Sequence, residues 1–336
     1  MNHRPLLSRV ADSVYWMSRY IERAENVARF IDVNLQLMLE APAAAQQWRP
    51  LIDTSGDSEA FFKRHPVATR EAVIGFLTFD AKNPNSILSC LRSARENARS
   101  VRDTISSEMW EQANRLFLMM LDEISGSGTR TPHELYRELK LACHLFQGIT
   151  DSTMSHNEAW HFIRLARMLE RADKTTRILD VKYFLLLPRL EDVGTPIDDV
   201  QWAAVLKSVS GFEMYRKRYG RIKPNDVAEF LVLDREFPRA VRHCVIGASK
   251  SLYAITGSPQ DTFGNRAESL LGHLRADLDY TPLRDIIGGG LHEFLDGLQV
   301  KMNCVDQAIL DTFFALRPAG GPAQTGNAFW QASEQK

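Results

Sequence analysis

Two short segments carry the residues best suited to chemistry, and the segments are similar to each other. Tyr20–Val33 reads YIERAENVARFIDV, and Met168–Val181 reads MLERADKTTRILDV. At 100° per residue, most charged side chains of each segment fall on one side of a helix, which would present a mixed stripe of carboxylates and cations. The candidate residues, including the one before each segment, are Arg19, Glu22, Arg23, Glu25, Arg29, Asp32, Arg167, Glu170, Arg171, Asp173, Arg177 and Asp180.

These stripes allow three interpretations. In the first, paired arginines bind phosphate or carboxylate, while the acids bind an amine or Mg²⁺. In the second, the stripes face each other in a partly buried ionic layer, with Glu22 and Arg29 pairing with Arg177 and Glu170. Such a layer fixes helix register more than it stabilises the fold. In the third, each stripe is solvated, and its ion pairs contribute only about 0.2–0.5 kcal/mol each.

A further group of arginines lies on another expected helix. Arg92, Arg95, Arg99 and Arg102 recur at helical spacing in LRSARENARSVRD. They would form either a solvated face or an anion-binding stripe on which a partner could dock. The second half of the chain has no matching arginines. Whatever this stripe does is therefore not a duplicated role.

Familiar catalytic and metal motifs are missing from the sequence. There is no GxSxG, no HExxH and no Cys/His pair with supporting spacing. Glu158 and His161 form one ExxH motif, but a di-iron bundle needs two such motifs and two further glutamates. The glycines in IIGGGLHEF lack the Lys-Ser/Thr of a phosphate-binding loop, so we expect a turn there. We predict neither a bound metal nor a cofactor, and the missing motifs favour a protein that is not an enzyme.

Helical periodicity dominates the chain, and the expected fold class is all-α. Turn signals such as SGSGTRTP and PRLEDVGTP separate the helices. The last twenty residues, 317–336, are rich in Pro, Gly and Gln, and we expect a disordered tail. The expected helices lie near 7–40, 69–79, 84–106, 107–124, 132–153, 156–187, 198–218, 224–233, 238–256, 263–279 and 291–316.

Internal similarity goes beyond the two opening segments. VIGFLTFDAKNPNSILSC, from residue 73, matches VAEFLVLDREFPRAVRHC, from residue 227, and HELYREL matches the later HEFLDGL. Three blocks in one order indicate a tandem duplication. We therefore expect a multi-helix bundle of two pseudo-symmetric repeats, 1–153 and 156–316, joined in one integrated domain. The two charged helices, 20–33 and 168–181, should lie near the pseudo-two-fold axis, close together and antiparallel.

Composition excludes several classes of function. The formal net charge is −1, so the chain lacks the basic character of a nucleic-acid-binding protein. The longest apolar run, YFLLL, is far too short to cross a membrane. The four cysteines are widely spaced, and the N-terminus does not resemble a secretory signal. We expect reduced thiols and a cytoplasmic protein.

Four long motifs make the chain recognisable. LLSRVADSVYWMSRYIERAENVARFIDV, SCLRSARENARSVRDTISSEMW, NEAWHFIRLARMLERADKTTRILDV and EFLVLDREFPRAVRHCV resemble the bacterial alpha-E family, a helical domain named for its Glu-Arg (ER) motif. The resemblance covers residues 5–316 and assigns the two ER motifs to Glu22-Arg23 and Glu170-Arg171. It also implies a circularly permuted ATP-grasp protein, fused or encoded nearby, and often a transglutaminase-like peptidase.

Three functions remain open at this point. ATP-grasp proteins of that kind are amide-bond ligases, so the resemblance implies a system that makes or modifies small peptides. The chain would be an accessory or binding partner of the ligase, which would act in trans. Alternatively, it would be an enzyme with an active site between the two ER helices. A purely structural scaffold or oligomer, with ER faces pairing between chains, is the third option.

Overall fold

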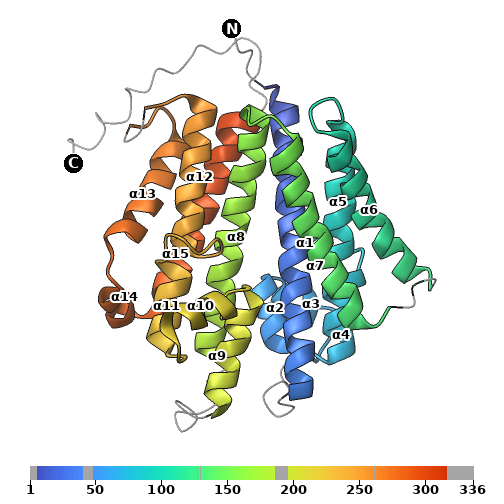
Figure 1. Cartoon of the computed structure of the whole chain (residues 1–336), viewed down its shortest axis with the longest axis vertical. Coiled ribbons are helices and arrows are strands. Elements are labelled where there is room, and N and C mark those ends of the chain that lie inside the picture. Colours follow the sequence, from blue (N-terminus) through green and yellow to red (C-terminus); the bar gives the residue numbers. More distant parts are fainter. Residues whose placement is uncertain are drawn as a thin grey trace.

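The computed structural model describes residues 6–40, 48–126, 128, 130–185, 196–259 and 262–315, and every regular element in these ranges is helical (Figure 1). The first half contains α1 (Ser8–Glu40), α2 (Arg49–Ser55), α3 (Ser58–Phe62), α4 (Arg70–Ile74) with a π-helical turn (Gly75–Phe79), α5 (Ile87–Ser100), α6 (Ser107–Ile124) and α7 (Pro132–Thr153). The second half contains α8 (Glu158–Leu185), α9 (Pro196–Ser208), α10 (Phe212–Tyr219), α11 (Pro224–Val232), α12 (Val241–Thr256), α13 (Arg266–Tyr280), α14 (Leu283–Gly289), α15 (Leu291–Ile309) and a second π-helical turn (Leu310–Phe314).

The helix ends follow local sequence signals. Thr131 caps α7 in a capping box, in which its side chain accepts from the Glu134 backbone while the Glu134 carboxylate accepts in return. Ser86 and Ser106 cap α5 and α6 through their hydroxyl groups. Gly257 ends α12 in the left-handed conformation, which costs glycine no steric penalty. These signals explain why the long helices lie close to their predicted ranges.

The two ER helices, α1 and α8, form the centre of the bundle and run in the same direction (Figure 1). Near their starts, the Leu6 backbone N–H donates to Glu158 at 2.9 Å, and the Ser18 hydroxyl donates to the Ile163 carbonyl at 2.8 Å. The predicted antiparallel arrangement is therefore wrong. A pseudo-two-fold axis across two helices makes them antiparallel, whereas an axis along them makes them parallel, and a sequence repeat does not distinguish the two.

The other long helices surround this central pair. On one side, α5 and α7 pack on α1, with α6 outside them; on the other, α12 and α15 pack on α8, with α13 outside them. Two short helices cross between the halves, because α2 packs on α8 and α9 packs on α1. One continuous hydrophobic core contains residues from both halves. None of the described helices is both long enough and apolar enough to cross a bilayer.

Some local predictions were wrong. The helix predicted at 198–218 breaks into α9 and α10, and Ser210 at the break has φ +52°. The turn expected in IIGGGLHEF is shorter than predicted, because α14 continues to Gly289 and only Gly290, at φ +98°, makes the turn. The short helices α2, α3 and α14 were not predicted, since five to seven residues carry too little periodicity. The expected tail, 317–336, lies outside the described residues.

Candidate functional site

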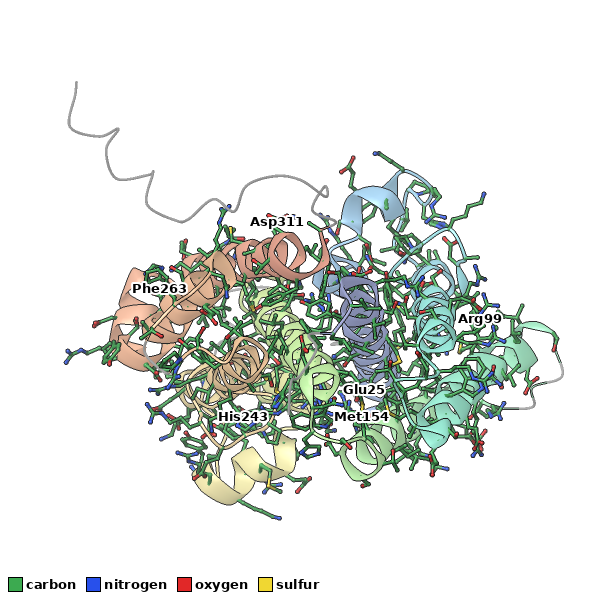
Figure 2. The ribbon with its side chains drawn as sticks, turned by 90° about the horizontal axis from the view of Figure 1, so that it is seen from above. Glu25, Arg99, Met154, His243, Phe263 and Asp311 are labelled. Carbon is green, nitrogen blue, oxygen red and sulfur yellow. The ribbon has the colours of Figure 1, made fainter. Side chains whose placement is uncertain are left out.

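The charged residues of the ER helices are inside the protein. Glu22, Glu25, Asp32 and Glu170 are each at most 1 % exposed, and Arg19, Arg29, Arg167 and Arg171 are at most 8 % exposed. Viewed from above, Glu25 lies in the middle of the molecule (Figure 2). The interpretation as two solvated stripes is therefore wrong. An unpaired buried charge is strongly destabilising, so each of these groups needs partners.

Two reciprocal ion pairs join the ER motifs. Arg171 donates to Glu22 from Nε at 2.8 Å and from Nη2 at 2.9 Å. Arg23 donates to Glu170 in the same two-pronged way, at 2.8 and 2.9 Å. Each ER motif thus accepts through its glutamate and donates through its arginine. Bidentate pairs of this kind combine strength with a fixed geometry.

The expected partners within the layer were partly wrong. We expected Arg29 and Arg177 to cross to the other helix, but each pairs within its own helix, Arg29 with Glu25 and Arg177 with Asp173. They lie one to two turns beyond the crossing pairs, where the helices no longer face each other through these side chains. The arginines that cross between the two helices are those of the Glu-Arg dipeptides and Arg19, which binds Glu170.

Around Glu170 the layer extends towards the surface. Arg19 donates to Glu170 at 2.7 Å and to Asp306 at 2.7 Å, and the Tyr15 hydroxyl also donates to Asp306, at 2.9 Å. Lys174 lies 3.8 Å from Glu170 and 3.3 Å from Asp173. Burial alone would raise the pKa of Glu170, but the charges of Arg23, Arg19 and Lys174 outweigh it and hold that pKa well below its usual value.

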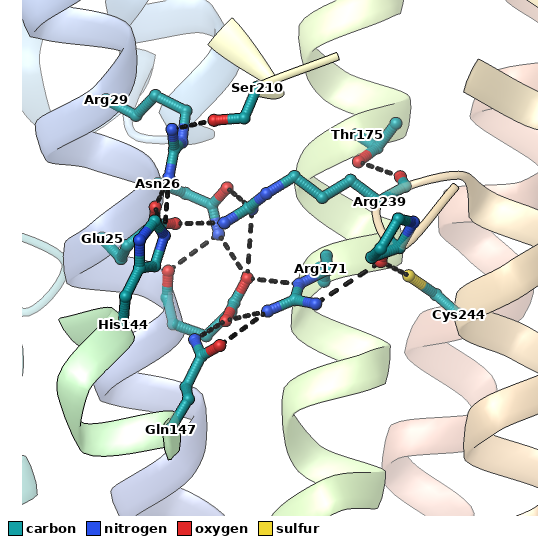
Figure 3. Close-up of polar contacts among 12 residues, drawn as sticks. Glu25, Asn26, Arg29, His144, Gln147, Arg171, Thr175, Ser210, Arg239 and Cys244 are labelled. Atoms are coloured by element: carbon teal, nitrogen blue, oxygen red, sulfur yellow. Dashed lines mark hydrogen bonds and ion pairs between the residues drawn. The ribbon is translucent and has the colours of Figure 1, made fainter. Parts of the chain in front are cut away.

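On the Glu22 side, Arg171, Arg239 and Gln147 lie close together in the layer (Figure 3). Besides Arg171, Glu22 accepts from Arg239 at 3.2 Å and from Gln147 at 2.9 Å. Arg239 also donates to Glu25 at 2.8 Å. Burial would raise the pKa of Glu22, yet Arg171 and Arg239 lower it to about 2. Glu22 is therefore ionised at neutral pH.

Two bases beside Glu25, Arg29 and His144, both have lowered pKa values. Nε2 of His144 lies 3.2 Å from a Glu25 carboxylate oxygen and 3.1 Å from Nη2 of Arg29. Nη1 of Arg29 donates to the Ser210 hydroxyl. Burial, followed by the charge of Arg239, lowers the pKa of Arg29 well below its usual value. Burial, followed by the charge of Arg29, lowers the pKa of His144 to about 4, which leaves the ring neutral at pH 7.

The last acid of each ER segment binds a histidine from its own half. Asp32 contacts Nδ1 of His133 at 2.6 Å and accepts from Lys140 at 2.6 Å. Asp180 contacts Nδ1 of His292, also at 2.6 Å. The histidines belong to HELYREL and HEFLDGL, the matched segments that begin α7 and lie in α15. The third repeat block therefore meets the end of the first in both halves.

Several members of the layer were missed in the sequence. Arg239, His144, Gln147 and Asp306 lie between 21 and 125 positions from the nearer ER segment, and nothing in the sequence groups them with the ER residues. Arg239 stands in the matched block EFPRAVRHC, but Asn85 takes the corresponding position in the first half. Only the packing of α7, α12 and α15 against the central pair brings these residues to the layer.

The space between the ER helices is small. A cavity of about 10 Å³, roughly the size needed for one water, is lined by Glu22, Gln147 and Arg167 among others. A mostly apolar cavity of about 70 Å³ lies further along α1 and α8 and is lined by Phe30 and Ile178 among others. A cavity of about 550 Å³ lies elsewhere, between α10, α11 and α13, and none of the ER residues lines it. In the described part of the chain, no three His, Cys, Asp or Glu side chains are placed to hold a metal ion.

The arginine stripe on and after α5 is mostly at the surface. Arg92, Arg99 and Arg102 are exposed, and Arg99 lies on the outer side of the molecule (Figure 2). Arg95 is half-buried and donates to Asn114 at 2.7 Å. Arg102 lies over the ring of Trp110, 5.1 Å from its centre. Three of the four arginines are thus accessible to a partner.

Comparison with known proteins gives one family. A family model described as "Alpha-E: A predicted alpha-helical domain with a conserved ER motif" matches residues 6–314. The chain is also similar to uncharacterised proteins of Mycobacterium bovis and of two strains of Mycobacterium tuberculosis, with 22% identity over 354 residues. These alignments cover 94% of this chain but only 38% of each relative. No solved structure matches the chain.

Proposed function

This chain belongs to the Alpha-E family, and from that premise we propose that it is a non-catalytic partner of a circularly permuted ATP-grasp ligase that makes or modifies small peptides. The observation that carries the proposal is the reciprocal pairing of Glu22 with Arg171 and of Glu170 with Arg23. Groups held in buried bidentate pairs are unavailable to a substrate. The ER motifs therefore act as structural elements that position the helices, and the function depends on surfaces around them.

The length of the relatives supports a partnership. The chain spans about 38% of the curated relatives that it matches, so in those proteins the Alpha-E segment is one part of a larger protein. A ligase that consumes ATP works where ATP is abundant, and we expect this chain in the cytoplasm with it. A transglutaminase-like peptidase is the second partner that the family resemblance implies.

The docking surface we propose is the arginine stripe. Arg92, Arg99 and Arg102 are exposed along one side of α5 and the turn after it. Guanidinium groups form bidentate pairs with carboxylates, and charged groups at the rim of an interface accelerate association with an oppositely charged surface. The partner's surface should accordingly be acidic, and complex formation should weaken as salt concentration rises.

We also infer that the chain consists of two duplicated units, 1–153 and 156–316. Matched contacts support this inference beyond the ER pairs. The Cys90 thiol donates to the Pro84 carbonyl at 3.7 Å, and the Cys244 thiol donates to the Pro238 carbonyl at 3.4 Å. A superposition of Tyr20–Val33 on Met168–Val181 should carry Val73–Cys90 onto Val227–Cys244; failure of the second pair to follow would contradict the duplication.

Affinity purification from the native host at low salt, with mass spectrometry of the bound proteins, tests the proposed partnership. We expect an ATP-grasp ligase to co-purify, and the double variant Arg92→Glu/Arg99→Glu to lose it. Arg284→Glu, at an exposed arginine of α14, is the matched control and should retain the ligase. Turnover of a peptide substrate by the purified chain alone would overturn the non-catalytic assignment and favour the enzyme alternative. A pure homo-oligomer would favour the scaffold alternative.

A further inference from the structure

We propose that the chain binds a small oxyanion, a carboxylate or a phosphate, where Arg29, Arg239 and Ser210 meet beside His144 (Figure 3). The site lies at one end of the ionic layer, between α1, the start of α12, the turn after α9 and α7. This proposal is independent of a ligase partner, because it depends only on the residues around Glu25.

The first observation is an excess of buried positive charge. The carboxylates of Glu22 and Glu25 are surrounded by four buried arginines, namely Arg29, Arg167, Arg171 and Arg239. The next acid, Asp151, is about half exposed, and its ion pair with Arg167 is long, at 3.8 Å. Buried cations in excess of their counter-charges are unfavourable, and a bound anion would relieve that imbalance.

Despite burial, the charge of Glu22 raises the pKa of Arg171, but the other bases in this half of the layer have lowered pKa values. Burial, followed by the charge of Arg171, lowers the pKa of Arg239 to about 10 and also lowers that of Arg167. The pKa values of Arg29 and His144 are lowered as well. Around Glu170, by contrast, the pKa values of Arg23 and Arg19 are raised. The positive potential is therefore unbalanced on the Glu22 side.

The second observation is the backbone of Ser210. Its φ of +52° is the left-handed region, which costs a residue with a Cβ about 1–2 kcal/mol. The matching turn in the first half, which follows α2, has Gly56 at φ +82°, and there the neighbour is Arg177 of the other ER helix. Where the first half has glycine, the second half has a serine whose hydroxyl contacts Arg29. The hydroxyl is the feature that distinguishes the two turns.

The third observation is access. Ser210 is exposed, and the side chain of His144 is 47 % exposed, whereas Arg29 behind them is only 5 % exposed. Nε of Arg29 has no hydrogen-bond partner among the described residues. Apart from Glu25, the acceptors of Arg29 are these two neutral groups. An oxyanion is a stronger acceptor for guanidinium than a neutral hydroxyl or imidazole, so it would compete well for the same N–H groups.

The equivalent place around Glu170 is built differently. Asn85 stands where Arg239 would be, and Asp306 binds Arg19 at 2.7 Å, which adds a third carboxylate to that side. Arg177 donates to both oxygens of Asp173 at 3.0 Å. We therefore expect one oxyanion site per chain rather than two.

Calorimetric titration and thermal unfolding of the full chain test the site with two probes, inorganic phosphate and the dipeptide Ala-Ala, against chloride at equal ionic strength. We expect one equivalent to bind, with a rise in Tm that follows the ligand concentration. Binding of both probes identifies a general oxyanion site. Binding of only one shows whether the ligand is a phosphate or a carboxylate. If neither probe at millimolar concentration raises Tm beyond the chloride control, the proposal fails.

Variants assign the binding to this site. Ser210→Gly keeps the backbone conformation, since the matching turn already has glycine, and should bind at least tenfold more weakly without losing stability. Arg29→Gln should abolish binding. Arg177→Gln, the corresponding change on α8, is the matched control and should bind as the unaltered chain does. Undiminished binding by Ser210→Gly, or equal losses in Arg29→Gln and Arg177→Gln, would overturn the assignment.

Discussion

Arg171 on α8 donates two parallel hydrogen bonds to the Glu22 carboxylate on α1, from Nε at 2.8 Å and from Nη2 at 2.9 Å. Arg23 and Glu170 repeat the contact in the opposite sense. Two such pairs on parallel helices specify one register, because sliding either helix by a turn would separate both pairs and leave four charges buried. The repeated Glu-Arg dipeptide therefore fixes the register of α1 against α8.

Removing one partner of the layer should destabilise the chain strongly. Glu22→Ala leaves Arg171 and Arg239 buried without their shared carboxylate, and we expect a loss of about 3–5 kcal/mol in the free energy of unfolding. Urea denaturation followed by circular dichroism measures it. Glu59→Ala removes the exposed pair with Lys63 and should leave the midpoint unchanged. Equal stability of Glu22→Ala and Glu59→Ala would rule out the structural role.

Stability should decline as the pH falls, in two stages. His144 has a pKa of about 4 in the folded chain, below its usual 6.5, so the unfolded chain binds that proton first between pH 6.5 and 4. Glu22 has a pKa of about 2 instead of 4.5, so its contribution is complete above pH 4.5 and is lost towards pH 2. Denaturation at pH 7, 5.5, 4 and 3 should show both stages. His144→Gln should weaken only the first, to which His161, whose pKa burial lowers as well, also contributes. A midpoint that rises on acidification would contradict these assignments.

The thiols should differ sharply in reactivity. Cys90, Cys143 and Cys244 are buried, and burial raises the pKa of Cys90 and of Cys244 to about 12 and that of Cys143 further still. The thiolate is the reactive form, so these three should react only after unfolding. Cys304 is exposed. Titration with a thiol reagent should find one reactive group in the native chain, none in Cys304→Ser, and four in denaturant.

The turn beside Arg177 should require glycine for two separate reasons. Gly56 has φ +82°, and an added Cβ would lie 3.3 Å from Nη1 of Arg177. Gly257 has φ +70°, but a Cβ there would meet no atom within 4 Å. Gly257→Ala should therefore cost only the backbone strain, about 1–2 kcal/mol, and Gly56→Ala should cost more because Arg177 must also move. Thermal unfolding compares the stability of the two variants. Equal losses of stability would contradict the prediction and show that the Arg177 side chain moves at no cost.

Local sequence was sufficient for much of the fold. The 3.6-residue periodicity located α1, α7 and α8 to within a few residues, because apolar spacing and caps act within one helix. It also identified the charged residues of the ER segments, since their positions on a helix follow from spacing alone. It was insufficient for α2 and for the break at Ser210, where the structure depends on what α2 and α9 pack against.

The sequence by itself determined that two helices would carry matched charges; only the tertiary structure decided how those charges are used. The repeat is compatible with an axis along or across the helices, and the packing of both halves selected the parallel arrangement. The partners Arg239, His144 and Asp306 come from distant parts of the chain, so no local pattern could assign them. Burial then decided how much these ion pairs matter for stability. In water the same carboxylates and guanidinium groups would form weak pairs. Between α1 and α8, removing one partner leaves the other charge buried and unpaired, which is strongly destabilising.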